Sequence, residues 1–119
     1  MQYMLLNYTT PDRYRDAEDV RAAAGADDVW GVYTRALIDA GVLVSGNALH
    51  PAEAATTVRL RAGAAEIEDG PYATTKEYLG GYYVIEVPDL DAALAWAARN
   101  PAAADGAVEV RPIVDLGAG

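Results

Sequence analysis

The segment GGYYVIEVPDLDAALAWAARNP, residues 80–101, carries the strongest strand and helix signals in the chain. Residues 82–87 are apolar in both alternating sets except at Glu86, a pattern typical of a strand that is covered on both faces. Asp89 is placed to cap a helix that begins after Pro88, and Pro101 ends it. We therefore expect a strand followed directly by a helix, whose buried stripe is Leu90, Ala93, Leu94 and Ala97.

The N-terminal half has the same order of strand and helix. Residues 2–8 again form an apolar run on both faces, which predicts a strand. A helix is expected to begin at Asp27 or Asp28 and to end at Gly41, with a buried stripe of Trp30, Tyr33, Leu37 and Ala40. The charged, alanine-rich stretch 11–26 between them predicts a further short helix that ends at Gly25.

The remaining strands have weaker signals. Residues 42–44 predict a strand, which is followed by a polar loop at residues 45–47. Residues 56–61 alternate Val58 and Leu60 with polar side chains, which indicates a strand with one solvated face. A turn at residues 62–64 is expected to join it to a partner strand over 65–68, and a last strand is expected over 107–114.

This order of elements predicts one α+β domain over residues 1–119, with the split βαβ pattern of a ferredoxin-like fold and an extra hairpin. Two helices cover one face of such a sheet. Because the strands at 2–8 and 82–87 are apolar on both faces, the other face needs a cover, and a second copy of the sheet is the simplest one. We expect a homodimer with the two sheets face to face.

Composition excludes several classes of function. A length of 119 residues suits one domain, and the formal net charge of −9 with dispersed arginines disfavours nucleic acid as a partner. No stretch approaches the ~20 apolar residues of a membrane-spanning helix, so no membrane partner is expected. The chain has no cysteine and its first residues do not resemble a signal peptide, which favours the cytoplasm.

A longer stretch supports a family resemblance. Residues 68–83, which contain Asp69-Gly70-Pro71-Tyr72, closely resemble the signature of the YCII-related family, in its branch named for Asp-Gly-Pro-Phe (DGPF). Further similarity lies at residues 4–6, 40–43, 56–59, 86–91, 95–97 and 108–112, so the resemblance covers most of the chain except 9–28. It implies a dimeric α/β barrel-like assembly of ferredoxin-like subunits.

The resemblance implies less about activity. Members of this branch are mostly uncharacterised, some are associated with extracytoplasmic-function sigma factors, and the wider family includes a dehydrochlorinase and a proposed His-Asp pair. That pair has no counterpart here, because no histidine precedes His50. The sequence also departs from the branch at Tyr72, where Phe is usual, and at Thr74, where Glu is common.

Asp69 is the first candidate catalytic residue. Its turn, with Gly70 and Pro71, has the chemistry of an ordinary tight turn, which is the structural interpretation. In the functional interpretation, the turn holds the Asp69 carboxylate at a cleft beside the sheet, where partial burial makes it a general base. His50 is the second candidate, as an acid-base partner of Asp69 if its loop folds over the turn; the alternative is a solvated loop histidine.

The candidate substrate-binding residues are Tyr72, Lys76, Tyr82 and Tyr83. Lys76 is suited to an anionic substrate, and the alternative is a solvent-exposed, ion-paired lysine. Eight tyrosines and no phenylalanine favour half-polar surroundings, either a ligand cavity with phenol groups or an ordinary core and interface. Because Tyr82 and Tyr83 point to opposite faces of their strand, one of the two lines any given pocket.

One histidine and no cysteine disfavour a metal site, and Gly80-Gly81 lacks the following lysine and helix of a phosphate loop, so no cofactor is expected. The sequence therefore predicts a small, cofactor-independent homodimer with a ligand cleft near the Asp69 turn. It acts either as an acid-base enzyme or as a small-molecule binder. The alternative is a non-catalytic regulatory or interaction protein linked to a sigma factor or a biosynthetic cluster.

Overall fold

The computed structural model describes residues 1–72 and 76–117. Four strands form one antiparallel sheet in the order β2-β5-β1-β6: β1 (Gln2–Thr9), β2 (Leu43–Ala48), β5 (Tyr78–Glu86) and β6 (Ala107–Pro112). The chain passes through helices between β1 and β2 and again between β5 and β6, and in each case one strand lies between the two that are connected. These are two interleaved split βαβ units, so the predicted α+β fold is confirmed.

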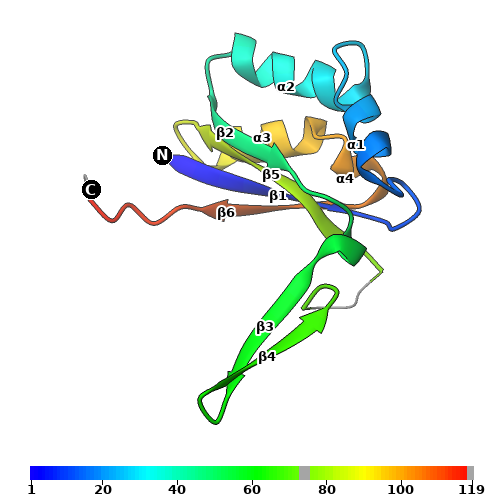
Figure 1. The fold of residues 1–119 in the computed structure, drawn as a ribbon. Coiled ribbons are helices and arrows are strands. Elements are labelled where there is room, and N and C mark those ends of the chain that lie inside the picture. The colour runs from blue at the N-terminus through cyan, green and yellow to red at the C-terminus, as the bar shows by residue number, and fades with distance from the viewer. Residues whose placement is uncertain (73–75, 118–119) are drawn as a thin grey trace.

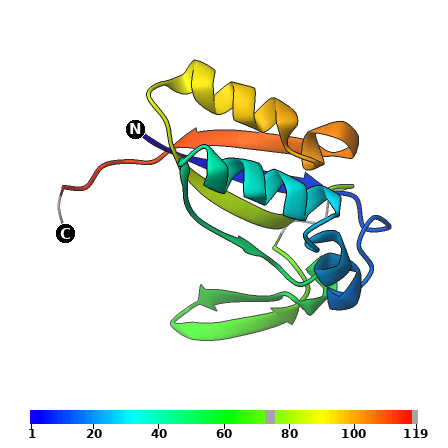
Figure 2. The ribbon, with the colours of Figure 1, turned by 90° about the horizontal axis from the view of Figure 1, so that it is seen from above.

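The helices lie on one face of the sheet (Figure 1). They are α1 (Ala17–Ala23), α2 (Val29–Asp39), α3 (Leu90–Arg99) and the short α4 (Ala102–Asp105), with a 3₁₀ turn η1 (Ala52–Ala54) before the hairpin. Figure 2 shows α2 and α3 running side by side over the sheet, with α1 next to the first turn of α2. None of the helices among the described residues is long and apolar enough to span a bilayer.

Aspartates begin three of these helices, as the sequence predicts for two of them. The Asp28 carboxylate accepts from the Val29 backbone N–H at 2.7 Å, and the Asp89 carboxylate accepts from Ala92 N–H at 2.9 Å. Asp16 does the same for α1, where it accepts from Asp19 N–H at 3.0 Å. Each carboxylate satisfies an N–H group that has no partner within the helix, which is why these helices start where they do.

The core lies between the helices and the sheet. Alternate residues of β1, beginning with Tyr3 and Leu5, are buried on the helix side, where they meet Leu37 of α2 and Ile85 of β5. Leu5, Leu37 and Ile85 are fully buried. Alanines at 93 and 97 let α3 approach this layer closely.

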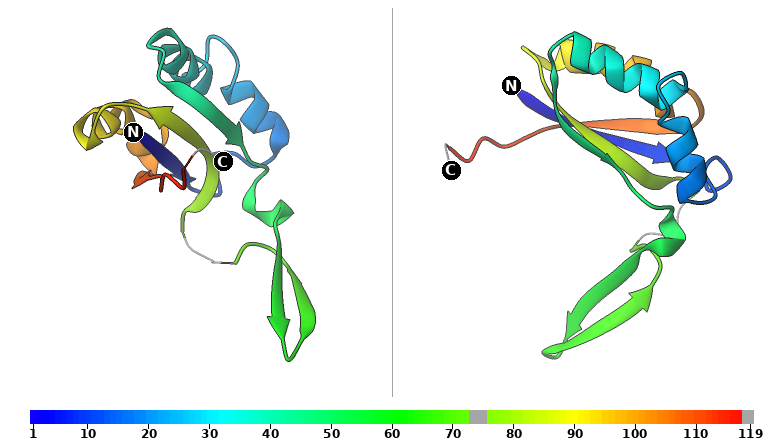
Figure 3. Two further views of the ribbon diagram at one scale, coloured as in Figure 1. Left: turned by 90° about the vertical axis from the view of Figure 1, so that its left-hand side faces the viewer. Right: turned by 45° about the horizontal axis from the view of Figure 1, so that its top comes forward.

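Register fixes which face each residue of β5 occupies. Tyr83 lies opposite Leu5, and Tyr82 lies opposite Leu6. Directly opposed residues share a face, so Tyr83 is on the helix side and Tyr82 is on the other side. The second face carries the half-buried side chains of Met4, Leu6, Tyr8 and Tyr82 and the more buried Val84, and we call it the open face because no helix of the described chain covers it (Figure 3).

Four boundaries differ from the expectations. The predicted polar loop at 45–47 is wrong, since these residues continue β2 and pair with β5. β5 begins at Tyr78 rather than 82, and β6 ends at Pro112 rather than 114. The chain also re-enters a short helix directly after the predicted stop at Pro101. For the strands, the deciding hydrogen bonds join distant parts of the chain, which local patterns do not report. The helix after Pro101 instead rests on local bonds, such as that from Gly106 N–H to the Ala102 carbonyl at 2.8 Å.

The predicted hairpin is confirmed as a separate two-stranded sheet of β3 (Thr56–Arg61) and β4 (Ala64–Asp69). Its turn residues Ala62 and Gly63 have φ values of 50° and 79°, as in the turns that suit the twist of a hairpin. The hairpin extends from the sheet on the side opposite the helices (Figure 1, Figure 3). The Cα radius of gyration is 15.8 Å, against about 13.5 Å expected for a compact domain of this length.

One face of the hairpin is apolar but not covered. Val58 lies directly opposite Ile67, and Leu60 follows on the same face. The exposed fraction is 60% for Val58, 68% for Ile67 and 76% for Leu60. The strand was expected to have one solvated face. In the single chain its apolar face is exposed as well, because the hairpin projects beyond the rest of the described domain.

Candidate functional site

A cavity of about 240 Å³, which we call the main cavity, lies between the sheet and the helices α1 and α2. Its floor comes from β1, β2 and β5, and its roof from α1, α2 and the loop that precedes α1. Among the described residues that line it, none has a carboxylate, lysine, arginine or histidine side chain. The lining residues are Asn7, Tyr14, Val20, Ala24, Trp30, Thr34, Leu43, Gly46, Asn47, Ala48, Gly81, Tyr82 and Tyr83.

Small residues on the floor create the space. Ala48 of β2 lies opposite Gly81 of β5, and Gly46 lies opposite Tyr83. A Cβ atom on Gly81 would lie 2.8 Å from the Asn47 carbonyl oxygen, and one on Gly46 would lie 2.8 Å from the Tyr83 ring. Glycine therefore lets the strands and the ring approach closely, and leaves the floor without bulky side chains.

Aromatic rings form one wall. The Trp30 indole of α2 stacks on the Tyr83 ring, with centroids 6.3 Å apart and planes at 24°. Tyr33 packs edge-on against Tyr83 at 5.5 Å, and its phenol donates to the Trp96 carbonyl at 2.8 Å. These contacts fix the two rings that face the cavity, so the wall is flat and rigid.

Hydroxyl groups of Thr34 and Tyr83 meet at this wall. Their oxygens are 2.6 Å apart, and either one can be the donor. Burial raises the pKa of the Tyr83 phenol above its ordinary value, and the hydrogen bond with Thr34 opposes this shift. Burial likewise raises the pKa of Tyr33, and the hydrogen bond with Asn100 opposes the rise. Both phenols are therefore neutral at physiological pH and do not serve as bases.

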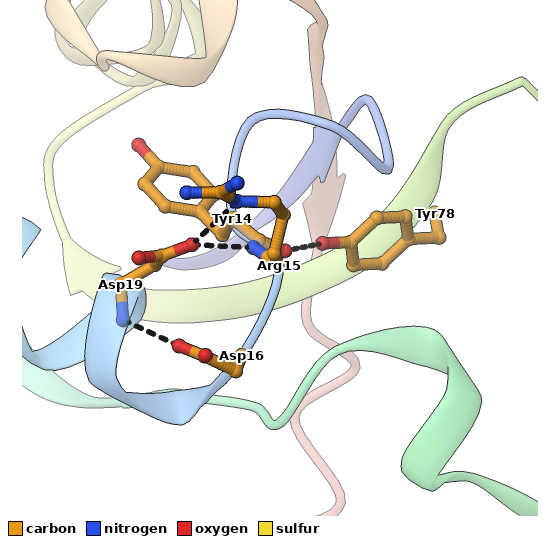
Figure 4. Close-up of polar contacts among 5 residues, drawn as sticks. All are labelled: Tyr14, Arg15, Asp16, Asp19 and Tyr78. Carbon is orange, nitrogen blue, oxygen red and sulfur yellow. Dashed lines mark hydrogen bonds and ion pairs between the residues drawn. The ribbon is translucent and has the colours of Figure 1, made fainter.

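The loop before α1 brings Tyr14 to the cavity. The Trp30 indole N–H donates to the Tyr14 phenol oxygen at 2.6 Å. The backbone carbonyl of Tyr14 accepts from the Tyr78 phenol at 3.1 Å (Figure 4). Figure 4 also shows a second hydrogen bond that holds this loop, in which the Asp19 carboxylate accepts from the Arg15 backbone N–H at 2.8 Å. The loop is thus tied both to β5 and to the start of α1.

Asn7 is the buried polar residue of the floor, with an exposed fraction of 4%. Its orientation follows from a chain of hydrogen bonds that starts at Ala102, whose backbone N–H donates to Asn100 Oδ1 at 2.9 Å. Asn100 must then donate through Nδ2, and it does so to Asn7 Oδ1 at 2.8 Å. The amide Nδ2 of Asn7 is left as a donor on the side of the cavity.

The Asp69 turn lies elsewhere. Its backbone is held by bonds from Gly70 N–H to the Ala55 carbonyl at 2.7 Å and from the Thr57 hydroxyl to the Gly70 carbonyl at 2.8 Å. Gly70 has a φ of 100°, which favours glycine. Asp69 itself is exposed and lines a shallow hollow of about 480 Å³ with Glu53 and others. The partial burial that a general base needs is not supplied by the described part of the chain.

The structure does not bring His50 and Asp69 together. His50 is exposed and lines a different hollow with Tyr72 and Tyr78. Between the described residues, no hydrogen bond or ion pair joins His50 to Asp69. The two hollows share Pro71, Ala52 and Tyr78, so the two candidate residues stand on neighbouring surfaces.

The predicted substrate-binding residues are also dispersed. Tyr72 is exposed, with the Arg59 guanidinium 5.1 Å from its ring centroid, and Lys76 is exposed. Tyr82 lies on the open face, where its phenol oxygen accepts from Asn47 Nδ2 at 2.7 Å. Tyr83 points to the helix side and the main cavity. Tyr82 also contributes to the cavity lining, so the expectation that one of the two tyrosines lines any given pocket is wrong for this cavity. Thr74 lies outside the described residues.

Sequence reasoning did not single out Asn7, Tyr14, Thr34 or Gly46 as site residues. A signal existed for two of them. Thr34 is four residues after Trp30, so it shares the buried stripe of the helix, and Asn7 continues the buried alternation of Tyr3 and Leu5. Tyr14 belongs to a stretch without periodicity. In residues 1–72 and 76–117, no group of three or more metal-ligating side chains is placed to hold an ion.

Comparison with known proteins places this α+β domain in one family. The chain belongs to the YCII-related domain family, whose sequence profile matches residues 1–117. It is 42% identical over 81 residues to the uncharacterized protein R00369 of Rhizobium meliloti (strain 1021). That alignment covers 66% of this chain and 65% of the relative, so the chain spans just under two thirds of the relative's length.

Proposed function

We propose that this protein binds a small molecule in the main cavity. The observation that supports this proposal is the cavity itself. It is a space of about 240 Å³ under α1 and α2, with a flat aromatic wall and a few polar groups that point into it. Binding sites for small molecules have this composition, a mostly apolar lining with few polar groups that orient the ligand. The bulk of the site lies on the helix side of the β2–β5 edge, away from the Asp69 turn.

The test uses the neutral fluorescent compound N-phenyl-1-naphthylamine and the variant Ala48→Phe. Ala48 is on the cavity floor, and a phenylalanine there fills the space. The wild-type protein should enhance the fluorescence of the compound saturably, and the variant should lose most of that binding. Ala103→Phe makes the same change at an exposed position of α4 and should bind as wild type does. Equal binding by Ala48→Phe and wild type would contradict the proposal.

We also propose the dimeric α/β-barrel assembly, in which a second copy covers the open face and the apolar face of the hairpin. Two observations support it. Met4 and Leu6 lie on the open face, which no helix of the described chain covers, and the hairpin exposes Val58, Leu60 and Ile67. Exposed apolar surface of this kind marks an interaction site, and an isolated two-stranded hairpin is marginally stable. We take a second copy of the same chain as the partner that covers both surfaces.

We propose that the chain belongs to the DGPF branch of the family, because it has the Asp69-Gly70-Pro71-Tyr72 turn with Gly70 at positive φ.

Acid-base chemistry by Asp69 and His50 is the second candidate function. It is supported by the two adjoining hollows that these residues line, which share Tyr78. The Asp69→Asn variant tests it. If the two residues act as a pair, the variant should change the NMR chemical shifts of the His50 imidazole. Unchanged shifts together with a loss of stability assign Asp69 to the turn alone. The remaining candidates are then the small-molecule binder and the regulatory protein linked to a sigma factor or biosynthetic cluster.

A further inference from the structure

Three polar groups of the main cavity have hydrogens to donate into it. The first is the Tyr14 phenol. An indole N–H can only donate, so in the bond with Trp30 the Tyr14 oxygen is the acceptor. The Tyr14 hydroxyl hydrogen therefore has no acceptor among the described residues and is free for a ligand.

The second donor belongs to the pair of Thr34 and Tyr83. One hydroxyl of the pair donates to the other at 2.6 Å, and this uses one hydrogen of two. The remaining hydrogen has no further bond within the described chain. The third donor is the Nδ2 group of Asn7, whose orientation is fixed from Ala102 through Asn100. Asn7 is nine-tenths buried or more, so water does not readily replace a ligand partner.

The charge of the ligand follows from the rest of the lining. The cavity has no arginine, lysine or histidine in its walls, so a carboxylate or phosphate would be desolvated without an opposite charge. It also has no acidic side chain to pair with a cationic ligand. Apart from the uncharged amide of Asn47, the remaining lining consists of rings and small or aliphatic residues, and the stacking of Trp30 on Tyr83 at 24° gives it a flat wall.

We infer that the main cavity takes a planar, uncharged compound, aromatic or conjugated, that carries a carbonyl oxygen as hydrogen-bond acceptor. The flat part lies along Trp30 and Tyr83, and the oxygen accepts from the donors of Tyr14, Asn7 and the Thr34–Tyr83 pair. This inference rests on the proposed function, since it names the ligand class of the same cavity.

The experiment compares three compounds of similar size as competitors of N-phenyl-1-naphthylamine. They are 2-acetylnaphthalene, with a carbonyl oxygen, 2-ethylnaphthalene, without an acceptor, and 2-naphthoate, with a carboxylate. The ketone should bind about 10-fold more tightly than the hydrocarbon, as two hydrogen bonds allow. The carboxylate should bind at least about 10-fold more weakly than the ketone, because its charge has no partner.

Two variants connect this preference to the named donors. Tyr14→Phe and the double variant Thr34→Val/Tyr83→Phe, which removes both hydroxyls of the pair, should each weaken binding of the ketone about 3- to 10-fold and leave the hydrocarbon unchanged within about twofold. Tyr3→Phe and Thr56→Val are the matched controls, because neither residue lines the main cavity, and they should change neither affinity. Circular dichroism and thermal unfolding establish that each variant is folded.

The possible outcomes separate the two proposals. If N-phenyl-1-naphthylamine does not bind to the wild-type protein, the proposed function fails and the ligand class fails with it. If it binds but the ketone competes no better than the hydrocarbon, or if the carboxylate competes best, the inference is overturned while the binding function stands. A ketone preference that both variants abolish supports the inference.

Discussion

The Tyr78 phenol donates a hydrogen bond to the backbone carbonyl of Tyr14 at 3.1 Å, across 64 positions of the sequence. Tyr78 is the first residue of β5 and lines the two hollows beside the Asp69 turn, whereas Tyr14 lines the main cavity. One hydrogen bond therefore links the family-like segment to the loop over the cavity. This loop has no other hydrogen bond to β5 among the described residues.

Removing this bond should loosen the loop. We expect Tyr78→Phe to lower the free energy of unfolding by about 0.5 to 1.5 kcal/mol and to weaken binding of N-phenyl-1-naphthylamine about twofold to fivefold, as roughly 0.4 to 1 kcal/mol of lost preorganisation implies. Urea unfolding and fluorescence titration measure the two effects. Tyr72→Phe, at an exposed ring, should leave stability unchanged; equal effects of the two variants would show that the bond to Tyr14 is immaterial.

Breaking the buried hydrogen bond between the amides of Asn7 and Asn100 should lower the free energy of unfolding substantially. In Asn100→Ala, the Asn7 Oδ1 atom and the Ala102 N–H both lose their partner in a buried place. Leaving buried polar groups unpaired costs about 1 to 3 kcal/mol each, so we expect a loss of roughly 2 to 6 kcal/mol for the two groups. Chemical denaturation measures it. Asn47→Ala breaks an exposed bond to Tyr82 and should cost less than about 1 kcal/mol.

The hairpin tests the proposed dimer. Replacing Val58, Leu60 and Ile67 together by serine removes its exposed apolar face. Light scattering at micromolar concentration should find a dimer for wild type and a monomer for the triple variant, whose far-ultraviolet circular dichroism stays that of a folded domain. The control is Glu68→Ser, on the opposite face of β4, which should remain a dimer. A monomeric wild-type mass would contradict the assembly.

Alkaline pH should destabilise the protein through its buried phenols. The pKa values of Tyr83 and Tyr33 are raised in the folded state, mainly by burial. Each phenol therefore contributes stability that is fully present below the unfolded pKa of about 10 and is lost as pH rises through the folded pKa. Above about pH 10 the free energy of unfolding should fall by up to about 1.4 kcal/mol per pH unit for each group.

Urea unfolding between pH 8 and pH 11.5, over the window set by the ordinary tyrosine pKa of about 10, measures that slope. Tyr83→Phe removes one of the two phenols, so its slope should be smaller than that of wild type. Identical slopes would mean that Tyr83 does not contribute to the loss of stability.

Local chemistry was enough to predict most of the fold. The aspartate caps at 28 and 89 and the apolar run at 82–87 act through neighbours in the sequence, and they placed α2, α3 and most of β5. The miss at residues 45–47 has a different cause. Gly46 and Asn47 have the composition of a loop, but Gly46 is there because the Tyr83 ring packs over it. That contact joins residues 37 positions apart.

The site was less predictable than the fold. Tyr83 was a candidate because it belongs to a cluster of tyrosines in the sequence, and the cavity beside it depends on small residues at Gly46, Ala48 and Gly81. A small residue that leaves space for a cavity produces no periodic pattern in the sequence. Asp69 and His50 attracted notice as titratable groups in loops, and the path of the chain between η1 and β4 sets them on separate surfaces.

The anchor of the cavity loop engages the main chain at position 14, and not the side chain. Any amino acid at that position offers the same carbonyl to Tyr78, so the loop keeps its attachment when residue 14 changes. Position 14 is thus a point where the lining of the cavity can be changed without loss of this anchor, provided that the new side chain or water accepts from the Trp30 indole N–H. Libraries that vary this single residue are a direct route to redirecting the protein toward new molecules.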